Sequence, residues 1–171
     1  TKGYLRAFNA LSNQDEFDIN LLVTPGLSLD LHRTVINRGV DLCETREDCF
    51  YILDCVSANN QPGRVDDAVQ QVSTIDSNYA ATYYPWVKII DPATNVLQPY
   101  PPSSLMMAVY AANDKTAAEW FAPAGLNRGG IESAVAVMDR LNFAERDTLY
   151  EGKVNPIAAF PGQGIVAFGQ K

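Results

Sequence analysis

Side chains that could carry out catalysis are few and scattered in this sequence. The 171 residues contain one histidine, His32, and no G-x-S-x-G segment of the kind that presents a serine nucleophile. The three cysteines, Cys43, Cys49 and Cys55, follow a spacing that suits neither a zinc site nor a set of paired disulfides. We therefore predict no catalytic residue and no metal site, and we expect small, apolar, reduced thiols, as in a protein assembled in a cytosol.

Acidic side chains occur as two adjacent pairs, Glu47-Asp48 and Asp66-Asp67. Because neighbours along a helix do not face each other, neither pair predicts a general acid and base that act together. Asp66 and Asp67 fall near the start of a predicted helix, where carboxylates complement the helix dipole, and we prefer this role to metal binding. The cluster Glu145-Arg146-Asp147 is interpreted as a solvated or helix-capping group, with a salt bridge between subunits as the alternative.

Two glycine-rich segments share some features with phosphate-binding loops. Gly162-Gln163-Gly164 lacks a third glycine and does not join a first strand to its helix, and the segment 125–130 lacks a Gly-Lys-Ser/Thr ending. No nucleotide or other cofactor is therefore predicted. Prolines and apolar residues interrupt both segments, unlike flexible polar linkers, so we expect fixed loops packed on a core.

Aromatic residues gather around several prolines in the middle of the chain. The group consists of Tyr83, Tyr84, Trp86 and Tyr100 with Pro85, Pro99, Pro101 and Pro102. Such a group suits either a carbohydrate or peptide platform or a core edge sealed by a rigid loop. We prefer the core edge, because the apolar residues Val87, Ile89 and Ile90 continue the same strand.

Composition indicates a globular protein with few charges. Hydrophobic residues make up 47% of the chain and charged residues 19%. The net charge of −7 arises mainly in residues 1–85, which hold 12 acidic and 6 basic side chains. With no basic patch, nucleic-acid binding is not predicted, and an anionic membrane would repel the acidic half. We find no signal peptide and no apolar run near the ~20 residues that span a bilayer.

The elements that would position these residues alternate between strands and helices. Apolar residues at helical spacing predict helices at 4–11, 64–75, 105–113, 132–140 and 143–150. A further helix is predicted to begin after Ser28, which would be its N-cap. Apolar and β-branched runs predict strands at 17–24, 49–56, 81–90, 157–160 and 165–168. Pro25-Gly26 is expected to end the first strand, Pro85 to mark an edge or bulge, residues 59–63 to form a turn, and residues 98–102 to be extended.

This order predicts an α/β fold, turning to α+β in the last third of the chain. We expect a mixed, largely parallel sheet flanked by helices, with packed loops rich in proline and glycine.

Two loops in the second half of the chain carry a family resemblance. The first has a Trp followed by Ala-Pro-Ala-Gly and Asn-Arg-Gly; the second has Asn-Pro-Ile, Pro-Gly-Gln-Gly and a closing Gly-Gln-Lys. The motif positions are Trp120, Pro123, Gly125, Asn127, Arg128, Gly129, Asn155, Pro156, Pro161, Gly162, Gly164 and Gly169. The segments 77–79, 83–88 and 144–152 add to the match. Over residues 77–171 the chain resembles the sheath proteins of contractile phage tails of the T-even type, whereas the similarity is weak over residues 1–76.

The resemblance implies a structural protein rather than an enzyme. Sheath subunits of this family stack as hexameric rings around a tail tube, and a baseplate signal lets them slide into a shorter array of lower energy. The sheath thereby drives the tube through the host envelope without nucleotide hydrolysis. The implied partners are other subunit copies, tube proteins and baseplate proteins, without nucleic acid or membrane. The implied location is the virion, after assembly in the host cytoplasm.

Family members are longer than this chain, which implies a single domain from the middle of a multi-domain subunit. Residues 1–16 and 155–171 would lead into its adjacent parts, and the chain alone would be monomeric. Gly125, Gly129 and Gly162 are expected to adopt backbone angles closed to other residues. Arg128 is expected to bridge loop carbonyls or a neighbour's carboxylate.

An α/β enzyme, or a domain that binds a small ligand or carbohydrate, is the alternative. Such domains bind ligands at the carboxyl ends of parallel strands, which here points to Thr24-Pro25-Gly26.

Overall fold

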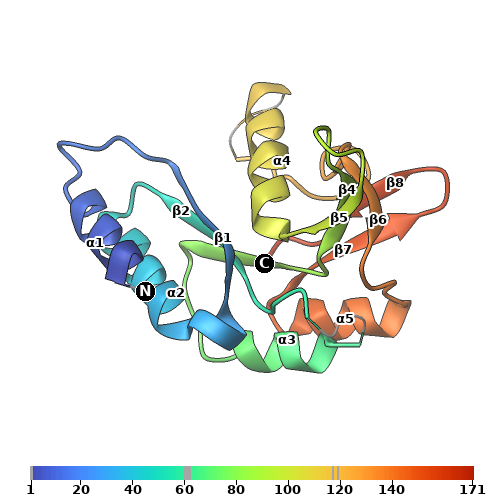
Figure 1. The fold of residues 1–171 in the computed structure, drawn as a ribbon, viewed down its shortest axis with the longest axis horizontal. Coiled ribbons are helices and arrows are strands. Elements are labelled where there is room, and N and C mark those ends of the chain that lie inside the picture. Colours follow the sequence, from blue (N-terminus) through green and yellow to red (C-terminus); the bar gives the residue numbers. More distant parts are fainter. Residues whose placement is uncertain (1, 60–62, 117, 119) are drawn as a thin grey trace.

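A computed structural model describes residues 2–59, 63–116, 118 and 120–171 (Figure 1). The helices are α1 (Lys2–Leu11), α2 (Leu29–Arg46), α3 (Val65–Val72), α4 (Pro102–Thr116) and α5 (Phe143–Glu151). The strands are β1 (Leu21–Ser28), β2 (Phe50–Asp54), β3 (Ala80–Tyr84), β4 (Val87–Ile90), β5 (Leu97–Tyr100), β6 (Ala134–Val137), β7 (Asn155–Phe160) and β8 (Gly164–Ala167). The predicted turn at 59–63 includes residues 60–62, which lie outside the described residues.

The strands of the described residues form two sheets. The main sheet has the order β1-β2-β3-β7-β8, in which the first four strands run parallel and β8 returns antiparallel beside β7. The small sheet is antiparallel, with the order β5-β4-β6. The prediction of a mixed, largely parallel sheet with helices on its faces is confirmed.

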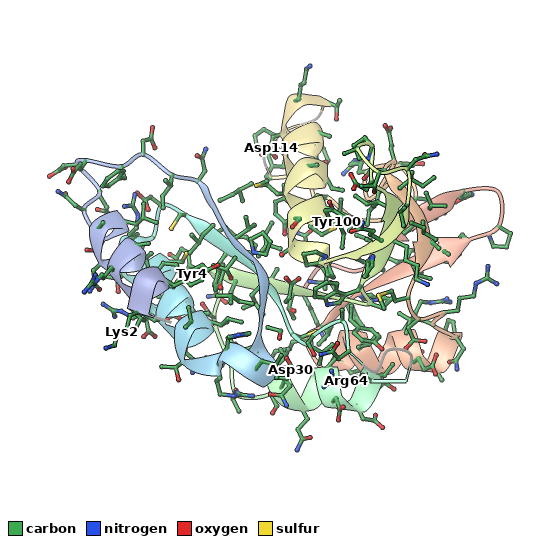
Figure 2. The ribbon with its side chains drawn as sticks, viewed as in Figure 1. Lys2, Tyr4, Asp30, Arg64, Tyr100 and Asp114 are labelled. Atoms are coloured by element: carbon green, nitrogen blue, oxygen red, sulfur yellow. The ribbon has the colours of Figure 1, made fainter. Side chains whose placement is uncertain are left out.

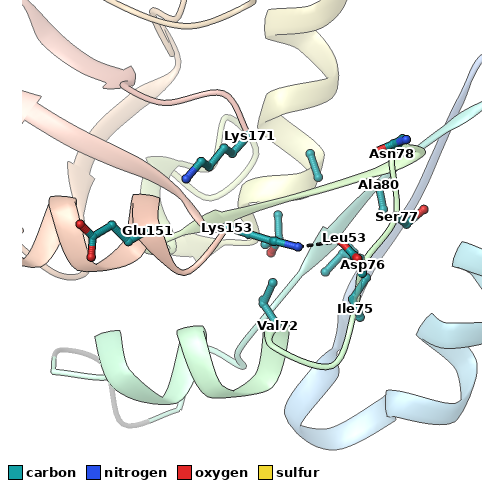
Figure 3. Close-up of a pocket in the computed structure, with 12 residues that line it drawn as sticks. Leu53, Val72, Ile75, Asp76, Ser77, Asn78, Ala80, Glu151, Lys153 and Lys171 are labelled. Carbon is teal, nitrogen blue, oxygen red and sulfur yellow. Dashed lines mark hydrogen bonds and ion pairs between the residues drawn. The ribbon is translucent and has the colours of Figure 1, made fainter.

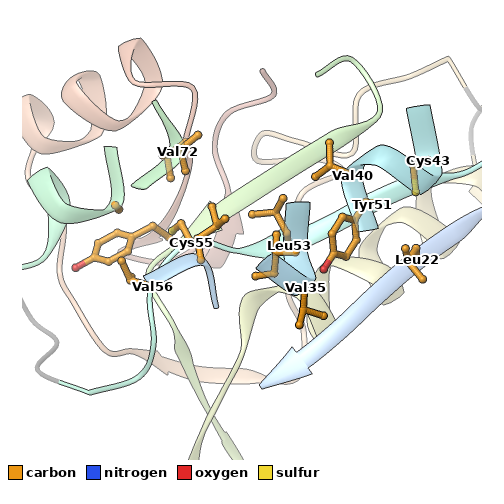
Figure 4. Packing of buried hydrophobic residues seen from close by; sticks show 14 of the residues in the cluster. Leu22, Val35, Val40, Cys43, Tyr51, Leu53, Cys55, Val56 and Val72 are labelled. Carbon is orange, nitrogen blue, oxygen red and sulfur yellow. The ribbon is translucent and has the colours of Figure 1, made fainter. Parts of the chain in front are cut away.

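Side chains of the main sheet alternate between two hydrophobic clusters. Tyr51, Leu53 and Cys55 pack with α2 and α3 on one face (Figure 4). Ile52 and Tyr83 point to the opposite face, where α4 and the small sheet cover them. Figure 1 shows the resulting layers, with α3 and α5 on one side of the main sheet and α4 on the other. Strands buried on both faces explain the continuous apolar runs in the sequence.

The cysteines belong to the first cluster. Cys43, Cys49 and Cys55 are free and buried, as expected for small apolar side chains.

β1 departs from its prediction, because it begins at Leu21 and continues through Pro25-Gly26 instead of ending there. Its register with β2 shifts between Val23 and Ser28, and Gly26 has a φ of +84°. β1 is an edge strand, where a proline without an N–H removes no bond to a second neighbour. The strand can therefore continue through Pro25-Gly26 because it lies at the edge of the sheet.

Pro85 marks neither an edge nor a bulge, so that interpretation was wrong. The chain leaves the main sheet at Tyr84 and enters the small sheet at Val87, and the buried Pro85 lies between the two strands. The apolar run at residues 81–90 thus contributes one strand to each of the two sheets.

The predicted helix at 132–140 is also wrong, since residues 134–137 form β6. Ile131, Val135 and Met138 mimic helical spacing, but pairing with β4 overrides it.

Arg64 ties helix α3 to helix α2. Arg64 Nη1 lies 3.1 Å from Asp30 Oδ2 and joins the start of α3 to the start of α2 (Figure 2). Burial opposes the charge of Asp30, yet hydrogen bonds from Ser28, Ser57 and Arg64 hold the pKa of its carboxyl below the usual value.

Within the described residues no helix has both the length and the apolar character needed to cross a bilayer.

Candidate functional site

The two motif-bearing loops meet in space, although residues 130–154 separate their motifs in the sequence. Gly125 N donates to Ala167 O at 2.7 Å, and Ala167 N donates to Gly129 O at 2.8 Å. Ile131 N donates to Ile165 O at 2.9 Å, and Gly130 pairs antiparallel with Val166. The first loop therefore covers the outer edge of β8 and extends the main sheet by a short bridge.

The motif glycines act in two different ways. Gly125, Gly162 and Gly164 have φ values of +86°, +77° and +79°, which side chains rarely allow, so the expectation for Gly125 and Gly162 is confirmed. Gly129 does not share this property, which corrects the expectation for it. A Cβ at Gly129 would lie 2.4 Å from Ala167 O, so this position requires glycine for close approach of two backbones.

The second loop closes on the start of β7. Asn155 is fully buried, accepts from Lys171 N at 2.8 Å and donates to Lys171 O at 3.2 Å. Phe168 N donates to Pro156 O, and a Cβ at Gly169 would lie 3.0 Å from Pro156 Cδ. These motif residues hold the chain's own backbone in place.

Other motif residues face solvent. Trp120 is 85% exposed, and Asn127, Arg128 and Pro161 are exposed as well, whereas Pro123 is buried. The guanidinium of Arg128 stacks over the Phe121 ring with a distance of 4.2 Å to the centroid. Neither of the roles expected for Arg128 includes this stacking. The loop thus presents an exposed apolar patch made of Trp120, Phe121 and Leu126.

A groove of about 470 Å³ lies beside this docked pair of loops. It is lined by Phe143, Arg146, Asp147 and Tyr150 of α5 and by Pro156 and Phe168, together with the first loop. Asn142 positions α5 through a capping box in which its side chain accepts from Glu145 N while Glu145 accepts from Asn142 N. The interpretation of the 145–147 cluster as a capping group is confirmed for Glu145.

A second pocket of about 270 Å³ lies between α3, β3 and the chain end (Figure 3). Lys153 Nζ lies 2.6 Å from Asp76 Oδ1 across it, and both side chains are exposed. An exposed ion pair of this kind contributes about 0–1 kcal/mol. The pocket is lined by two lysines, Lys153 and Lys171, and two acidic residues, Asp76 and Glu151, so its formal charges balance.

The strand-end site of the alternative hypothesis does not assemble. The hydroxyl of Thr24 is buried and lies 2.6 Å from Tyr51 Oη, so it is engaged in the core. His32 is half-buried, and its Nδ1 accepts from Ser28 N. Asp66 and Asp67 lie in the first turn of α3, as predicted. Among the described residues, no three His, Cys, Asp or Glu side chains are grouped to hold a metal ion.

The aromatic group at residues 83–100 is a core edge, as preferred from the sequence. Tyr83 and Tyr84 are buried, and Trp86 and Tyr100 are partly covered. Tyr83 Oη lies 2.9 Å from Tyr110 Oη, and Trp86 Nε1 donates to Val56 O. These rings are not presented as a platform.

Sequence reasoning missed Asp54, which lies at the carboxyl end of β2. Burial raises the pKa of its carboxyl to about 7, against the opposing effect of Ser103, whose N–H and O–H both donate to it. Asp54 thereby fixes the first turn of α4 to the main sheet. A polar residue ending an apolar run, CFYILDCV, is the only signal in the sequence.

Together, the fold and the site define a class of protein. It is an α/β domain in which the two motif-bearing loops pack on the domain's own main sheet and leave an exposed apolar surface beside them. Residues 1–171 match the family model described as the phage tail sheath protein central domain. The chain therefore belongs to the phage tail sheath family.

Relatives and solved structures agree with this family. The chain is 25% identical to the tail sheath protein of Enterobacteria phage T4, over 98% of this chain and 28% of that protein. It is 41% identical to the tail sheath protein of Vibrio phage KVP40, over 36% of this chain and 9% of that protein. The contracted helical sheath of the anti-feeding prophage is similar with a TM-score of 0.62 and 25% identity, over 96% of this chain and 42% of that chain.

The anti-feeding prophage baseplate contains a chain with the same fold, at a TM-score of 0.69 and 24% identity. This match covers 92% of this chain and 39% of the baseplate chain. Compared with the T4 tail sheath protein, the chain spans less than a third of the relative's length.

Proposed function

We propose that this chain is the central domain of a contractile tail sheath subunit, folded as one domain over residues 1–171. The observation that carries the proposal is the family match over the whole chain, supported by the similarity to a contracted helical sheath. The partners proposed are other copies of the subunit, the tail tube and the baseplate, and the location proposed is the phage virion after assembly in the host cytoplasm.

The architecture suits a part that moves as a rigid body. Both faces of the main sheet are packed, and the marked loops are bonded to β8 and β7. Because packed interiors resist deformation, contraction would change the contacts between subunits and leave each domain intact. No catalytic step and no cofactor enter this mechanism.

Electron microscopy of the polypeptide encoded by the native gene tests the proposal. Striated sleeves that shorten and widen on triggering are expected. Dispersed particles that turn over a substrate, with turnover abolished by one substitution in a pocket, would support the enzyme alternative.

A Trp120→Ala variant tests the role of the exposed loop. Removal of this ring should leave the fold intact, because the side chain is 85% exposed, but should weaken sleeve formation. Leu126→Ser, in the same patch, should have a similar but smaller effect, and sleeves unchanged by both substitutions would contradict a role for this loop.

A further inference from the structure

The fold brings two of the three cysteines into contact. Cys43 lies in the last turn of α2, and Cys49 directly precedes β2. Their Sγ atoms lie 3.3 Å apart, whereas a disulfide bond joins two sulfur atoms at about 2.05 Å. Closing this gap requires a movement of about 1.3 Å, which rotations of the two side chains can share. Cys43 and Cys49 are thus a pair of thiols whose sulfur atoms are already neighbours.

The backbone around this pair is fixed by the turn between α2 and β2. Glu47 ends α2 in the left-handed conformation, with a φ of +60°, and its N–H donates to Cys43 O at 2.9 Å. At the start of β2, Phe50 N donates to Asn20 O at 2.8 Å. The two thiols therefore meet because a short, hydrogen-bonded turn joins the helix to the strand.

The third cysteine is too far away to take part. Cys49 and Cys55 flank β2, and six residues of extended chain span about 20 Å. Cys55 Sγ donates instead to Tyr83 O at 3.7 Å. Figure 4 shows Cys43 and Cys55 in different parts of the hydrophobic cluster. The structure therefore allows one pairing within the folded chain, which the odd number of cysteines in the sequence does not indicate.

A surface segment restricts access to the pair. The buried Arg46 donates to Leu11 O and, at 2.8 Å, to Phe17 O, and it thereby holds this segment against the end of α2. Burial raises the pKa of Cys43 and of Cys49, so both thiols stay protonated and react slowly. Residues 12–18 are exposed, so this segment should open at a lower cost than the core. Oxidation should therefore proceed through local opening.

We propose that Cys43 and Cys49 form a reversible disulfide when the folded protein meets a small hydroperoxide, with hydrogen peroxide as the simplest case. One thiolate attacks the O–O bond and becomes a sulfenic acid, and one oxygen leaves as water. The second thiolate attacks that sulfur, forms the S–S bond and displaces the other oxygen as water. The two thiols together lose two electrons and two protons, which the peroxide takes up.

The disulfide would close a ring of seven residues, 43–49, between a helix and a strand of the main sheet. Such a ring restricts the unfolded chain more than the folded one, so the oxidised protein should resist unfolding. In the proposed location the chain folds in a reducing cytosol and acts in a virion outside it, where disulfides persist. The timing of oxidation rests on this proposed location, whereas the chemistry of the pair does not.

Peptide mapping of the 171-residue chain tests the pairing. The folded chain is treated with hydrogen peroxide, unfolded, alkylated with N-ethylmaleimide and digested with trypsin, which cuts after Arg46 and separates the two cysteines. We expect peptides 39–46 and 47–64 to be joined covalently, with one of the three thiols alkylated. Cys55→Ser should give the same joined peptides, which identifies Cys49 as the partner within 47–64.

Urea unfolding provides a second measurement. Oxidation should raise the urea midpoint of the wild type and of Cys55→Ser by about 1 M, and dithiothreitol should reverse the rise. Cys49→Ser should show neither the joined peptides nor the rise. Cys43→Ala should behave in the same way, and it replaces Cys49→Ser if that variant does not fold.

Four results would overturn the proposal. They are three unreacted thiols after treatment, a native disulfide that includes Cys55, oxidation to a sulfinic acid without an S–S bond, and a disulfide that forms only in urea. The state of the thiols in chains from released virions tests the timing separately, and reduced thiols there would reject it. If the disulfide forms but the native polypeptide assembles no sleeves, the sheath function is wrong and the pairing stands.

Discussion

Asp54 shows what a single residue does at the junction of a strand and a helix. Its carboxyl is 1% exposed at the end of β2 and accepts both the N–H and the O–H of Ser103 in the first turn of α4. Burial disfavours the charge, whereas the two donors and the helix dipole favour it. The raised pKa of about 7 means that burial outweighs the donors.

Asp54 should make the protein less stable as the pH rises from about 4 to about 7. The pKa rises from 3.8 to about 7 on folding, so the folded state binds the proton more tightly, and stability is lost as that proton leaves. Each pKa unit corresponds to about 1.4 kcal/mol, which sets the size at a few kcal/mol at most. Urea unfolding at pH 5 and pH 8 measures the difference.

Asp54→Asn is the matched variant, because its amide keeps an acceptor for Ser103 without a charge. It should approach the wild type only below about pH 4, where Asp54 is protonated in both the folded and the unfolded state, and its advantage in stability should grow between pH 5 and pH 8. A variant less stable than the wild type at pH 8 would show that the donors outweigh burial. Four other carboxyls have a pKa that is lowered in the folded protein, and they change its stability only below about pH 4, outside the range from pH 5 to pH 8. They are Asp30, Asp48, Asp76 and Asp91.

At the scale of elements, the docked loop depends on Gly129. Gly129→Ala should destabilise the fold by about 1–3 kcal/mol, because the new Cβ would overlap Ala167 O and Gly125 N, which are backbone atoms that cannot move aside. Gly130→Ala is the control, since nothing lies within 4 Å of a Cβ there. Thermal or urea unfolding compares the two, and equal stabilities would mean that the loop is not docked on β8.

Helix α5 depends on its capping box. Asn142→Ala removes the side-chain acceptor of Glu145 N and should cost about 1 kcal/mol. Asn142→Asp keeps the acceptor and should cost far less. Urea unfolding of the wild type and the two variants measures the difference.

Sequence reasoning worked for elements whose pattern is local. The runs at 49–56 and 157–160 became β2 and β7, because side chains buried on both faces leave a continuous apolar signal. It failed at 132–140, where alternating Ala and Val gained strand geometry from pairing with β4. Nor could it find that the first loop docks on β8, since backbone contacts between distant segments leave only a glycine in the sequence.

For the whole molecule, the acidic charge is concentrated in the first half of the sequence. Residues 1–85 carry 12 acidic and 6 basic side chains, whereas the rest of the chain is nearly balanced, with 8 acidic and 7 basic. Both halves contribute strands to the main sheet, and α3 packs on α5, so the imbalance lies along the sequence rather than between two ends of the fold.

The 171-residue chain alone should sediment as an 18.7 kDa monomer at micromolar concentration. A stable interface needs roughly 1,000 Å² of buried surface, so a sleeve must draw its stability from many contacts in each subunit. Sedimentation equilibrium measures the mass. Rings or tubes formed by the chain at micromolar concentration would show that its own surfaces suffice for assembly.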